Sequence, residues 1–595
     1  MKEYDQIIKH ALEAHVNGDL ENARSSYKKI LNINPEESIA LAWLGSLEAI
    51  NKNYEDAICL IQHAIKIEPL NSDYLANLAS VLCECNLLND ALFQINLAIE
   101  INKKNSIYYK NRAVININLK NFNDAKKDIE QLIKIDGTCS SETFLLIGNA
   151  QYGLGENREA LSSYEKAIEQ DNCNYEAYLN KANLLAKIKN HNGAIEAYMI
   201  AISINNNLTE AYSHLASVYL DLDDLNNAVI YCKKALEINP INIHAMNIYG
   251  LVNIRLTKFQ DAITYFDKII LLQPDNPNAN YNKSLVLMRL GNFKVGLPLY
   301  EWRWKTNEFE NSYRLIDKPL WLGGESINCK RILIYCEQGL GDTIQFSRYI
   351  EDIVKLGAIV TIQVPYVLMP LLKNLSRLSG LNVLISDKCD HVDFDFYCPI
   401  MSLPLALGGI GKHASYLIQD NPNIDKWKNY LGNRGFKIAI CWQGNQNSEA
   451  DIGRSFSVNF FSLISKIKNV RLISIQKNCL NCNVTKLKDL NIEELPEDFD
   501  TTSGAFMDSA AIMKCVDLVI TSDTALTHLA GALGVRTLLL LQHVPDWRWG
   551  LNTEDTIWYS NHKLIRQNFS GDWNGVFEKL KIEIEELLSK HNSDT

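Results

Sequence analysis

Long apolar runs and an excess of positive charge are both missing from this sequence. No stretch approaches the length of a membrane span, and the first residues, MKEYDQIIKHALEAH, place acids where a signal peptide needs an apolar core. A formal net charge of −11 and an isoelectric point near 5.7 leave no basic surface of the kind that binds nucleic acid. We therefore expect a cytoplasmic protein with no membrane span and no nucleic-acid partner.

The fourteen cysteines also lack the spacing of a disulfide or zinc framework. Cys479 and Cys482 stand at CxxC spacing, and no second pair completes a zinc site. We expect reduced thiols in ordinary core positions and no disulfides.

The chain has 595 residues, too many for one hydrophobic core, and its first half repeats itself. A small residue recurs every 34 residues, with one step of 35: Ala23, Ala57, Ala91, Ala125, Ala160, Ala194, Ala228, Ala262 and Gly296. A second series of small residues has the same period: Ala11, Gly45, Ala79, Ala113, Gly148, Ala182, Ala216, Gly250 and Ser284. A third series starts and ends with proline: Pro35, Pro69, Lys103, Gly137, Asn172, Asn206, Pro240 and Pro274.

These three series predict pairs of closely packed helices. Small side chains at two fixed places let paired helices approach each other, and the third series breaks each second helix before the next repeat. The period and the three series resemble the tetratricopeptide repeat over residues 1–305. The resemblance implies an α superhelical repeat array of about nine helix-turn-helix units, with a concave face that receives a peptide or a protein.

A row of polar residues stands two places before the second small series. It consists of Asn77, Asn111, Asn180, His214 and Asn282. An asparagine side chain both donates and accepts hydrogen bonds, so such a row can hold the backbone of an extended acceptor peptide. In this feature the array is similar to that of the protein O-linked N-acetylglucosamine transferases. Trp43, Leu146 and Ile248 interrupt the row in a chain that is rich in asparagine everywhere, so a row without function stays open as the alternative.

After the last repeat the pattern changes to that of two α/β domains. Residues 306–327 read as a linker or cap, and KRILIYCEQGLGDTIQFSRYIEDIVKLGAIVTIQVP then reads as a strand, a glycine turn, a helix and a second strand. Another set of apolar strands lies in FKIAICWQGN, RLISIQKN, DLVITSD and RTLLLLQHVP. We expect two Rossmann-like domains, residues 328–433 and 434–595, that face each other across a cleft.

Four blocks of this half resemble a known enzyme family. GLGDTIQFSRY, WQGNQ followed by GRS, DLVITSDTALTHLAGALG and VPDWRWG are similar to the heptosyltransferase-type glycosyltransferases of the GT-B fold, in particular their bacterial relatives that carry tetratricopeptide repeats. The resemblance covers most of residues 325–570. It implies an acceptor side in the first domain and a nucleotide-sugar side in the second. Nothing here resembles the catalytic domain of the O-linked N-acetylglucosamine transferases.

The glycine turn carries the candidate catalytic residue. Gly339 and Gly341 let the backbone turn tightly off the strand and are assigned to the donor side, and Asp342 follows at the start of a helix. The resemblance implies that Asp342 is the general base, which would take the proton of an acceptor hydroxyl while that hydroxyl inverts the anomeric carbon. An N-cap aspartate is the alternative.

The donor side draws on three segments. The strand 517–521 delivers Ser522, Asp523 and Thr524 to a helix N-terminus, where amide groups and the helix dipole favour an anion, and His528 lies one turn further on. Asp523 would cap the helix or bind a sugar or ribose hydroxyl, and His528 would donate to a phosphate or be structural. The other candidates follow the first strand of the second domain: Gln443, Gly444 and Asn445 for base and ribose, and Arg454 and Ser455 for the diphosphate.

Two further features leave alternatives open. Trp547, in VPDWRWG, would stack on a sugar or base, or plug the seam between domains. Asp393 and Asp395 have the spacing of metal ligands, but their segment alternates like an edge strand, which favours two solvent-facing carboxylates. We expect no metal and no cofactor beyond the nucleotide sugar, because Thr524, Arg454 and the helix N-terminus can stabilise the leaving phosphate.

Together these features predict an inverting glycosyltransferase that moves a sugar from a nucleotide sugar to a serine or threonine of a protein presented by the repeats. Some relatives with this arrangement modify bacterial flagellins, which makes flagellin the candidate acceptor by analogy. Two alternatives stay open: a heptosyltransferase-like enzyme of glycolipid assembly, and a non-catalytic repeat scaffold.

Overall fold

The computed structural model describes residues 2–309, 316–373, 375, 383–387, 393–411, 415–417, 423–445, 451–477, 484–501 and 504–594. It divides into two compact units, Met1–Ile248 and Tyr249–Thr595, and each is described by itself. Cys479 and Cys482, the CxxC pair, lie outside the described residues. The cysteines that are described are free thiols.

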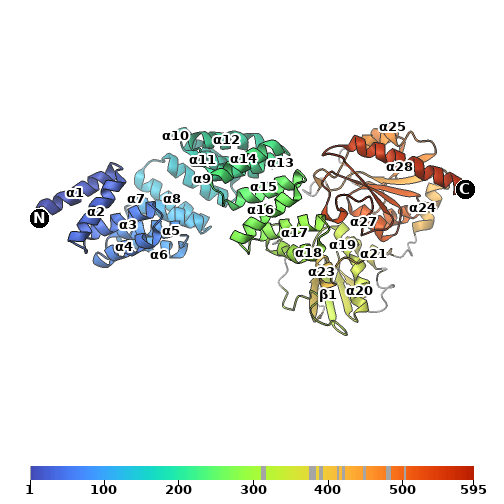
Figure 1. Ribbon diagram of the computed structural model, residues 1–595, viewed down its shortest axis with the longest axis horizontal. Coiled ribbons are helices and arrows are strands. Elements are labelled where there is room, and N and C mark those ends of the chain that lie inside the picture. Colours follow the sequence, from blue (N-terminus) through green and yellow to red (C-terminus); the bar gives the residue numbers. More distant parts are fainter. Residues whose placement is uncertain are drawn as a thin grey trace. The chain divides into compact units, whose positions relative to one another are not determined.

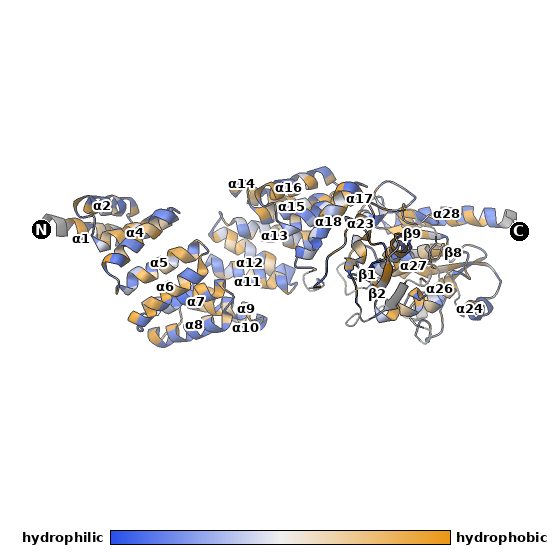
Figure 2. Ribbon diagram, turned by 90° about the horizontal axis from the view of Figure 1, so that it is seen from below, coloured by the Kyte–Doolittle hydropathy of each residue, from blue (hydrophilic) through white to orange (hydrophobic). Residues whose placement is uncertain are grey.

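Eighteen helices follow one another between residues 2 and 300, all within the described part of the chain (Figure 1). Their bounds are α1 Lys2–Val16, α2 Leu20–Ile33, α3 Ser38–Ile50, α4 Tyr54–Ile67, α5 Ser72–Glu84, α6 Leu88–Ile101, α7 Ser106–Asn118, α8 Phe122–Asp136, α9 Ser141–Gly153, α10 Asn157–Gln170, α11 Tyr175–Lys187, α12 His191–Ile204, α13 Thr209–Asp221, α14 Leu225–Ile238, α15 Ile243–Arg255, α16 Phe259–Leu272, α17 Pro277–Arg289 and α18 Phe293–Tyr300. Figure 2 shows hydrophilic and hydrophobic residues interleaved along the helices that it labels in this region, as expected of helices that are partly buried. The helical repeat array predicted from the spacing is confirmed.

The small residues act as the sequence analysis predicted. A methyl group added at Gly148 would lie 2.5 Å from the ring of Tyr164, and one added at Gly250 would lie 2.6 Å from the ring of Phe266. In each pair the larger side chain stands four residues after an alanine of the first series. A glycine or alanine therefore lets the two helices of a repeat touch, and the larger residue of the second helix fills the space.

A further periodic feature was not recognised in the sequence. The turn between the two helices of every repeat contains one residue in the left-handed region, with φ between 58° and 82°. These residues are Gly18, Lys52, Asn86, Lys120, Gly155, Lys189, Asp223, Thr257 and Gly291. Because only three of the nine are glycine, composition alone does not reveal the position.

The last repeat, α17 and α18, lies in the second compact unit, which begins at Tyr249, before the expected boundary at residue 305. Met288 of α17 and Tyr300 of α18 lie in the same hydrophobic core as Ile332 and Ile334 of the first sheet. The 3-10 helix Glu301–Lys305 follows, and its Arg303 is fully buried. Arg303 donates from Nε and Nη2 to both carboxylate oxygens of Glu337, at 2.9 Å each, and from Nη2 to Ser402 Oγ at 2.8 Å.

The first sheet is parallel and has the order β3-β2-β1-β4. Its strands are β1 Arg331–Tyr335, β2 Ile359–Gln363, β3 Val383–Ser386 and β4 Phe396–Pro399. β4 lies at an edge, as the alternation of its segment predicted, and the linker residues Pro319 and Trp321 hydrogen-bond to its Tyr397. The helices described in this domain are α19 Leu340–Phe346, α20 Ile350–Lys355, α21 Met369–Leu372 and α23 Leu403–Ala406.

The second sheet is also parallel, with the order β10-β9-β8-β5-β6-β7. Its strands are β5 Phe436–Cys441, β6 Val470–Ser474, β7 Ile492–Glu493, β8 Leu518–Ser522, β9 Thr537–Leu541 and β10 His562–Arg566. Numbered within the domain, this is the doubly wound order 3-2-1-4-5-6, in which the crossovers reverse direction between β5 and β8. The helices of this part are α24 Asn423–Leu431, α25 Val484–Asp489, α26 Met507–Met513, α27 Ala525–Ala532 and α28 Trp573–Asp594.

Alternation along the strands gives the second sheet two buried faces. Ile438 and Ile440 face a core that includes Val576 and Phe577 of α28, whereas Ala439 and Cys441 face the core shared with the first sheet. α24, which precedes the predicted boundary at residue 434, packs on the second domain through Trp427 Nε1, which donates to Asp508 Oδ1 at 2.7 Å. In the described part of the chain, no helix has both the length and the apolar character needed to cross a membrane.

Candidate functional site

The candidate site lies at the carboxyl ends of β5 and β8, where the second sheet changes the direction of its crossovers. In open parallel sheets this point is where ligands bind, because the loops on its two sides diverge. The segment Trp442–Asn445 leaves β5 here, and Ser522–Thr524 leaves β8. The structure therefore brings the two predicted donor-binding segments together.

The segment after β8 presents a helix N-terminus. Thr524 is the N-cap residue of α27, and its side chain makes no capping bond there; Oγ1 lies 3.3 Å from Thr521 Oγ1. Asp523 is half-buried, and burial, with a contribution from Asp546, raises its pKa to about 6. Ser522 is fully buried, and its hydroxyl has no hydrogen-bond partner among the described residues.

The segment after β5 is held by side-chain hydrogen bonds. Gly444 N–H donates to Ser455 Oγ at 3.0 Å, and that hydroxyl donates to the Asp451 carboxylate at 2.7 Å. Arg454 Nε donates to Asp451 Oδ1 at 3.1 Å. Arg454 thus already has a carboxylate partner, and a diphosphate would have to share it or replace it. The residues between Asn445 and Asp451 lie outside the described residues.

Asp342 stands in the first turn of α19 and is both a cap and half of an ion pair. Its Oδ2 accepts from the N–H of Gly339 at 2.9 Å, and its Oδ1 accepts from Nη2 of Arg548 at 2.5 Å. Burial raises the pKa of Asp342, and Arg548 is the strongest of the groups that oppose this rise. Gly339, not Asp342, is therefore the N-cap residue; Asp342 caps the helix from its third position, and the predicted role as a base stays a prediction.

Arg548 was missed as a site residue in the sequence. It lies in the 3-10 helix Trp547–Trp549, and its side chain is 9% exposed. A lone arginine between two tryptophans in VPDWRWG was the available signal, but sequence spacing does not reveal a partner that lies 206 residues away.

The glycine turn of the first domain meets the helix N-terminus of the second. A methyl group added at Gly341 would lie 2.9 Å from Cδ2 of His528 and 3.2 Å from Cα of Ala525. Gly341 is therefore required for the close approach of α19 and α27. His528 is buried in this contact, with Nδ1 3.0 Å from the Tyr559 hydroxyl and its ring stacked on Trp549. Burial holds the pKa of His528 well below its usual range, so the ring is neutral.

Trp547 lies in a seam within the second unit. Its ring packs against Phe293 and Tyr300 of the last repeat and against Trp558, and it is 4% exposed. This is the packing alternative given above, and stacking of Trp547 on a donor stays a prediction.

The polar row of the repeats is half-buried. Asn111 Nδ2 donates to Ser80 Oγ at 3.1 Å, and Asn180 Nδ2 donates to Asn149 Oδ1 at 2.8 Å, so equivalent members reach the preceding repeat in the same way. The ring of His214 lies 4.6 Å from that of His244, and burial lowers the pKa of His214. Asn77, Asn111, Asn180 and His214 lie in the first unit, whereas Asn282 lies in the second.

The candidate metal ligands, Asp393 and Asp395, lie at the end of the first sheet where its parallel strands begin. Asp393 Oδ2 is 2.6 Å from Nη1 of Arg331, and Asp395 Oδ2 accepts from the backbone N–H of Arg331 at 2.8 Å. Arg331 begins β1, whereas Gly339 and Asp342 follow the end of that strand. The two aspartates therefore pair with an arginine at the amino edge, away from Asp342.

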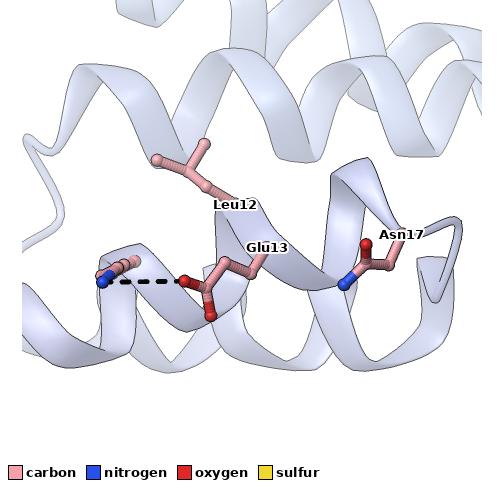
Figure 3. Close-up of a pocket in the computed structure, with 4 residues that line it drawn as sticks. Leu12, Glu13 and Asn17 are labelled. Atoms are coloured by element: carbon pink, nitrogen blue, oxygen red, sulfur yellow. Dashed lines mark ion pairs between the residues drawn. The ribbon is translucent and has the colours of Figure 1, made fainter.

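A surface depression of about 280 Å³ lies on α1, remote in sequence from these residues (Figure 3). Leu12, Glu13, Asn17 and Lys9 line it, and Glu13 pairs with Lys9 at 3.8 Å. One helix and one exposed ion pair supply no convergent polar groups, so this depression is not assigned a function.

Gly341→Ala should destabilise the second unit by about 1–3 kcal/mol, because the added methyl overlaps His528 and the backbone of Ala525. Denaturant unfolding measures the effect. Gly324→Ala is the matched control, since nothing lies within 4 Å of the added methyl and the backbone there does not need glycine. Equal stability of the two variants would contradict the close contact between α19 and α27.

Comparisons with known proteins agree with the repeat array. Two family models described as tetratricopeptide repeat match the chain, one at residues 108–139 and 209–242 and the other at 8–72, 145–207 and 250–301. Protein FlbA of Caulobacter vibrioides is 24% identical in a match 316 residues long that covers 48% of this chain. The chain matches only about half, 52%, of the length of that relative.

Three solved structures also resemble parts of the chain. A tetratricopeptide repeat protein from Parabacteroides merdae has a TM-score of 0.37 at 18% identity and covers 42% of this chain and 99% of its own. YrrB, described as a TPR protein with an unusual peptide-binding site, has a TM-score of 0.24 at 19% identity and covers 31% and 95%. Yeast Tom70 has a TM-score of 0.29 at 12% identity and covers 51% and 85%. From its spacing, its helices and the family matches, the N-terminal half of this chain is an array of tetratricopeptide repeats.

Proposed function

We propose that this chain is an inverting glycosyltransferase of the GT-B type, which moves a sugar from a nucleotide sugar to a serine or threonine of a protein held by the repeats. The observation that carries the proposal is the meeting of α19 and α27 at Gly341, within the second compact unit. This contact joins the turn that bears Asp342 to a helix N-terminus at the switch point of a doubly wound sheet.

The proposed donor site uses the N-terminus of α27. The first amide groups and the dipole of this eight-residue helix favour the diphosphate, and the hydroxyl of Thr524 adds a donor. Arg454 would turn from Asp451 toward the charge that develops as the glycosidic bond breaks. Gln443, Gly444 and Asn445 would meet the base and the ribose on the other side of the switch point.

The proposed base is Asp342. Ionised Asp342 would accept the proton of the acceptor hydroxyl as that oxygen attacks the anomeric carbon from the face opposite the leaving phosphate. Its two carboxylate oxygens each accept one hydrogen bond, from Gly339 and from Arg548, and a carboxylate has capacity for about four. The cap therefore leaves room for a hydroxyl donor.

The repeats support a protein acceptor. Tetratricopeptide arrays bind peptides and proteins along an extended face, and the row that contains Asn111 and Asn180 offers amides at the repeat spacing. Flagellin is the acceptor suggested by the resemblance to repeat-bearing enzymes of this type. A glycolipid acceptor and a scaffold without turnover are the competing outcomes.

Intact-mass analysis of proteins that co-purify with the full chain, with and without a panel of nucleotide sugars, tests the proposal. We expect one protein to gain the mass of one or more sugars with a single donor. Transfer to a glycolipid alone would favour the glycolipid alternative. Nucleotide-sugar binding without any transfer would favour the scaffold.

Asp342→Asn should lower transfer by about 10²–10⁴, the usual contribution of a general base, and leave donor affinity nearly unchanged. Rate is measured by intact mass, and donor affinity by calorimetry with the nucleotide sugar that the panel identifies. Asp352→Asn is the matched control, because it makes the same substitution in the neighbouring helix α20, where Asp352 lies 3.9 Å from Lys355. Transfer by Asp342→Asn within threefold of wild type would exclude the role as a base.

Transfer should survive EDTA, because the helix N-terminus, Thr524 and Arg454 supply the positive potential that a divalent cation would otherwise provide. Thr524→Val should lose donor affinity or rate, whereas Asp393→Asn and Asp395→Asn should keep both. The measurement is transfer after dialysis against EDTA, with and without added magnesium or manganese. Activity lost in EDTA and restored by either ion would refute metal-independent transfer.

A further inference from the structure

The guanidinium of Arg548 joins the two α/β domains at Asp342. Nη2 donates to Asp342 Oδ1 at 2.5 Å, and Nε donates to Gln345 Oε1 at 2.7 Å, both on α19 of the first domain. Nη1 donates to Asp546 Oδ1 at 2.8 Å in the second domain. A planar fork with three acceptors on two domains has one orientation that serves all of them.

Two aromatic rings pack against the same guanidinium. Its central carbon lies 4.6 Å from the ring centroid of Trp547 and 5.6 Å from that of Phe346. Asp546 also accepts from the backbone N–H of Arg548 at 3.0 Å, which fixes the start of the 3-10 helix. Arg548 is therefore held by hydrogen bonds in its plane and by packing above it, and Asp342 is held by Arg548.

We infer that Arg548 is a positioning residue for Asp342, and that its guanidinium holds the paired carboxylate in place at the contact between the two domains. The inference rests on the function proposed above for its catalytic meaning. The effect of Arg548 on the position and pKa of the Asp342 carboxyl does not depend on any substrate.

The charges around Asp342 come from three other elements. Asp546 and Arg548 lie on the segment after β9, Arg454 lies on the loop after β5, and His528 on α27 is neutral. Burial and Asp546 both raise the pKa of Asp342, whereas Arg548, the Gly339 N–H and Arg454 lower it. Loss of Arg548 removes the largest of the opposing effects, so the pKa of Asp342 would rise and the carboxyl would stay protonated up to a higher pH than in the wild type.

The last repeat also contacts the segment that carries Arg548. Arg289, at the end of α17, donates from Nε to the carbonyl oxygen of Pro545 at 2.9 Å, one residue before Asp546. Trp547, next to Arg548, packs on Phe293 and Tyr300 of α18. The last repeat thus contacts the loop that carries Arg548, and Arg548 in turn contacts Asp342.

The test compares Arg548→Met, which removes the charge, with Arg548→Lys, which keeps the charge but loses the planar fork. The first readout is the infrared carboxyl band that titrates in the full-length chain and is absent from Asp342→Asn; it needs neither donor nor acceptor. We expect Arg548→Met to raise its midpoint by about 1–3 pH units, and Arg548→Lys to leave it close to that of wild type.

The second readout is transfer with the acceptor and nucleotide sugar that the mass analysis identifies. The rate depends on ionised Asp342, so the acid limb of the pH profile of Arg548→Met should move to higher pH with the infrared midpoint. For Arg548→Lys we expect kcat to fall by about 10²-fold through misorientation, with the donor KM nearly unchanged.

Two controls keep the result interpretable. Arg548→Met leaves Asp546 without its partner, so the double variant Arg548→Met with Asp546→Asn is measured beside it, and circular dichroism checks the fold. Arg471→Met makes the same substitution in a second arginine-carboxylate pair, with Glu493, at the start of β6. It should leave the Asp342 midpoint in place.

An unchanged midpoint in both Arg548→Met and the double variant would overturn the inference, even if the rate fell. A raised midpoint in a chain whose wild type transfers no sugar would remove the proposed function and leave the control of Asp342 by Arg548 standing.

Discussion

The buried ion pair between Arg303 and Glu337 is the interaction on which the second unit depends. Both side chains have no exposed surface, and Arg303 also donates to Glu301 Oε1 at 2.8 Å and to Ser402. Leaving one member of such a pair without its partner costs about 3–5 kcal/mol, because a bare charge stays in a medium of low dielectric. Arg303 belongs to the segment after the last repeat, and Glu337 follows β1. The pair therefore makes the last repeat part of the α/β half.

The two sheets differ in what lies at their switch points, and in the first sheet this is the Arg303–Glu337 pair. Each contains the strand order 3-2-1-4, and each has its switch point beside its first strand. In the first sheet the carboxyl ends of β1 and β4 enclose Arg303, which binds Glu337 after one strand and Ser402 after the other. In the second sheet the equivalent place has Thr524 at the start of α27. With the same strand order, one switch point holds a buried arginine of the chain itself and the other holds the N-terminus of α27.

Much of this architecture could be predicted from the sequence, because the spacing of small and helix-breaking residues reflects how neighbouring helices pack. The series through Gly148 and through Pro35 predicted the helix pairs and their ends, and the apolar run before Ser522 predicted β8. The short strands β7 and β10 were missed: one has two residues, and the other begins and ends with a basic residue. Arg303 and Arg548 were missed for another reason. Their partners are distant in the sequence, and an arginine in a loop has the same appearance whether it is solvated or buried.

The alternatives for Asp342, cap or base, do not exclude each other physically. A cap needs one carboxylate oxygen directed at a backbone N–H of the first turn, and the bond from Gly339 to Oδ2 supplies it. A base needs a lone pair directed away from that turn and an ionised carboxylate, and Arg548, from the other domain, is the strongest of the groups that oppose the rise in the pKa of Asp342. The cap fixes the backbone geometry, and the arginine holds the carboxylate from the other domain. The base proposed above would therefore be complete only while Arg548 and Asp342 are in contact.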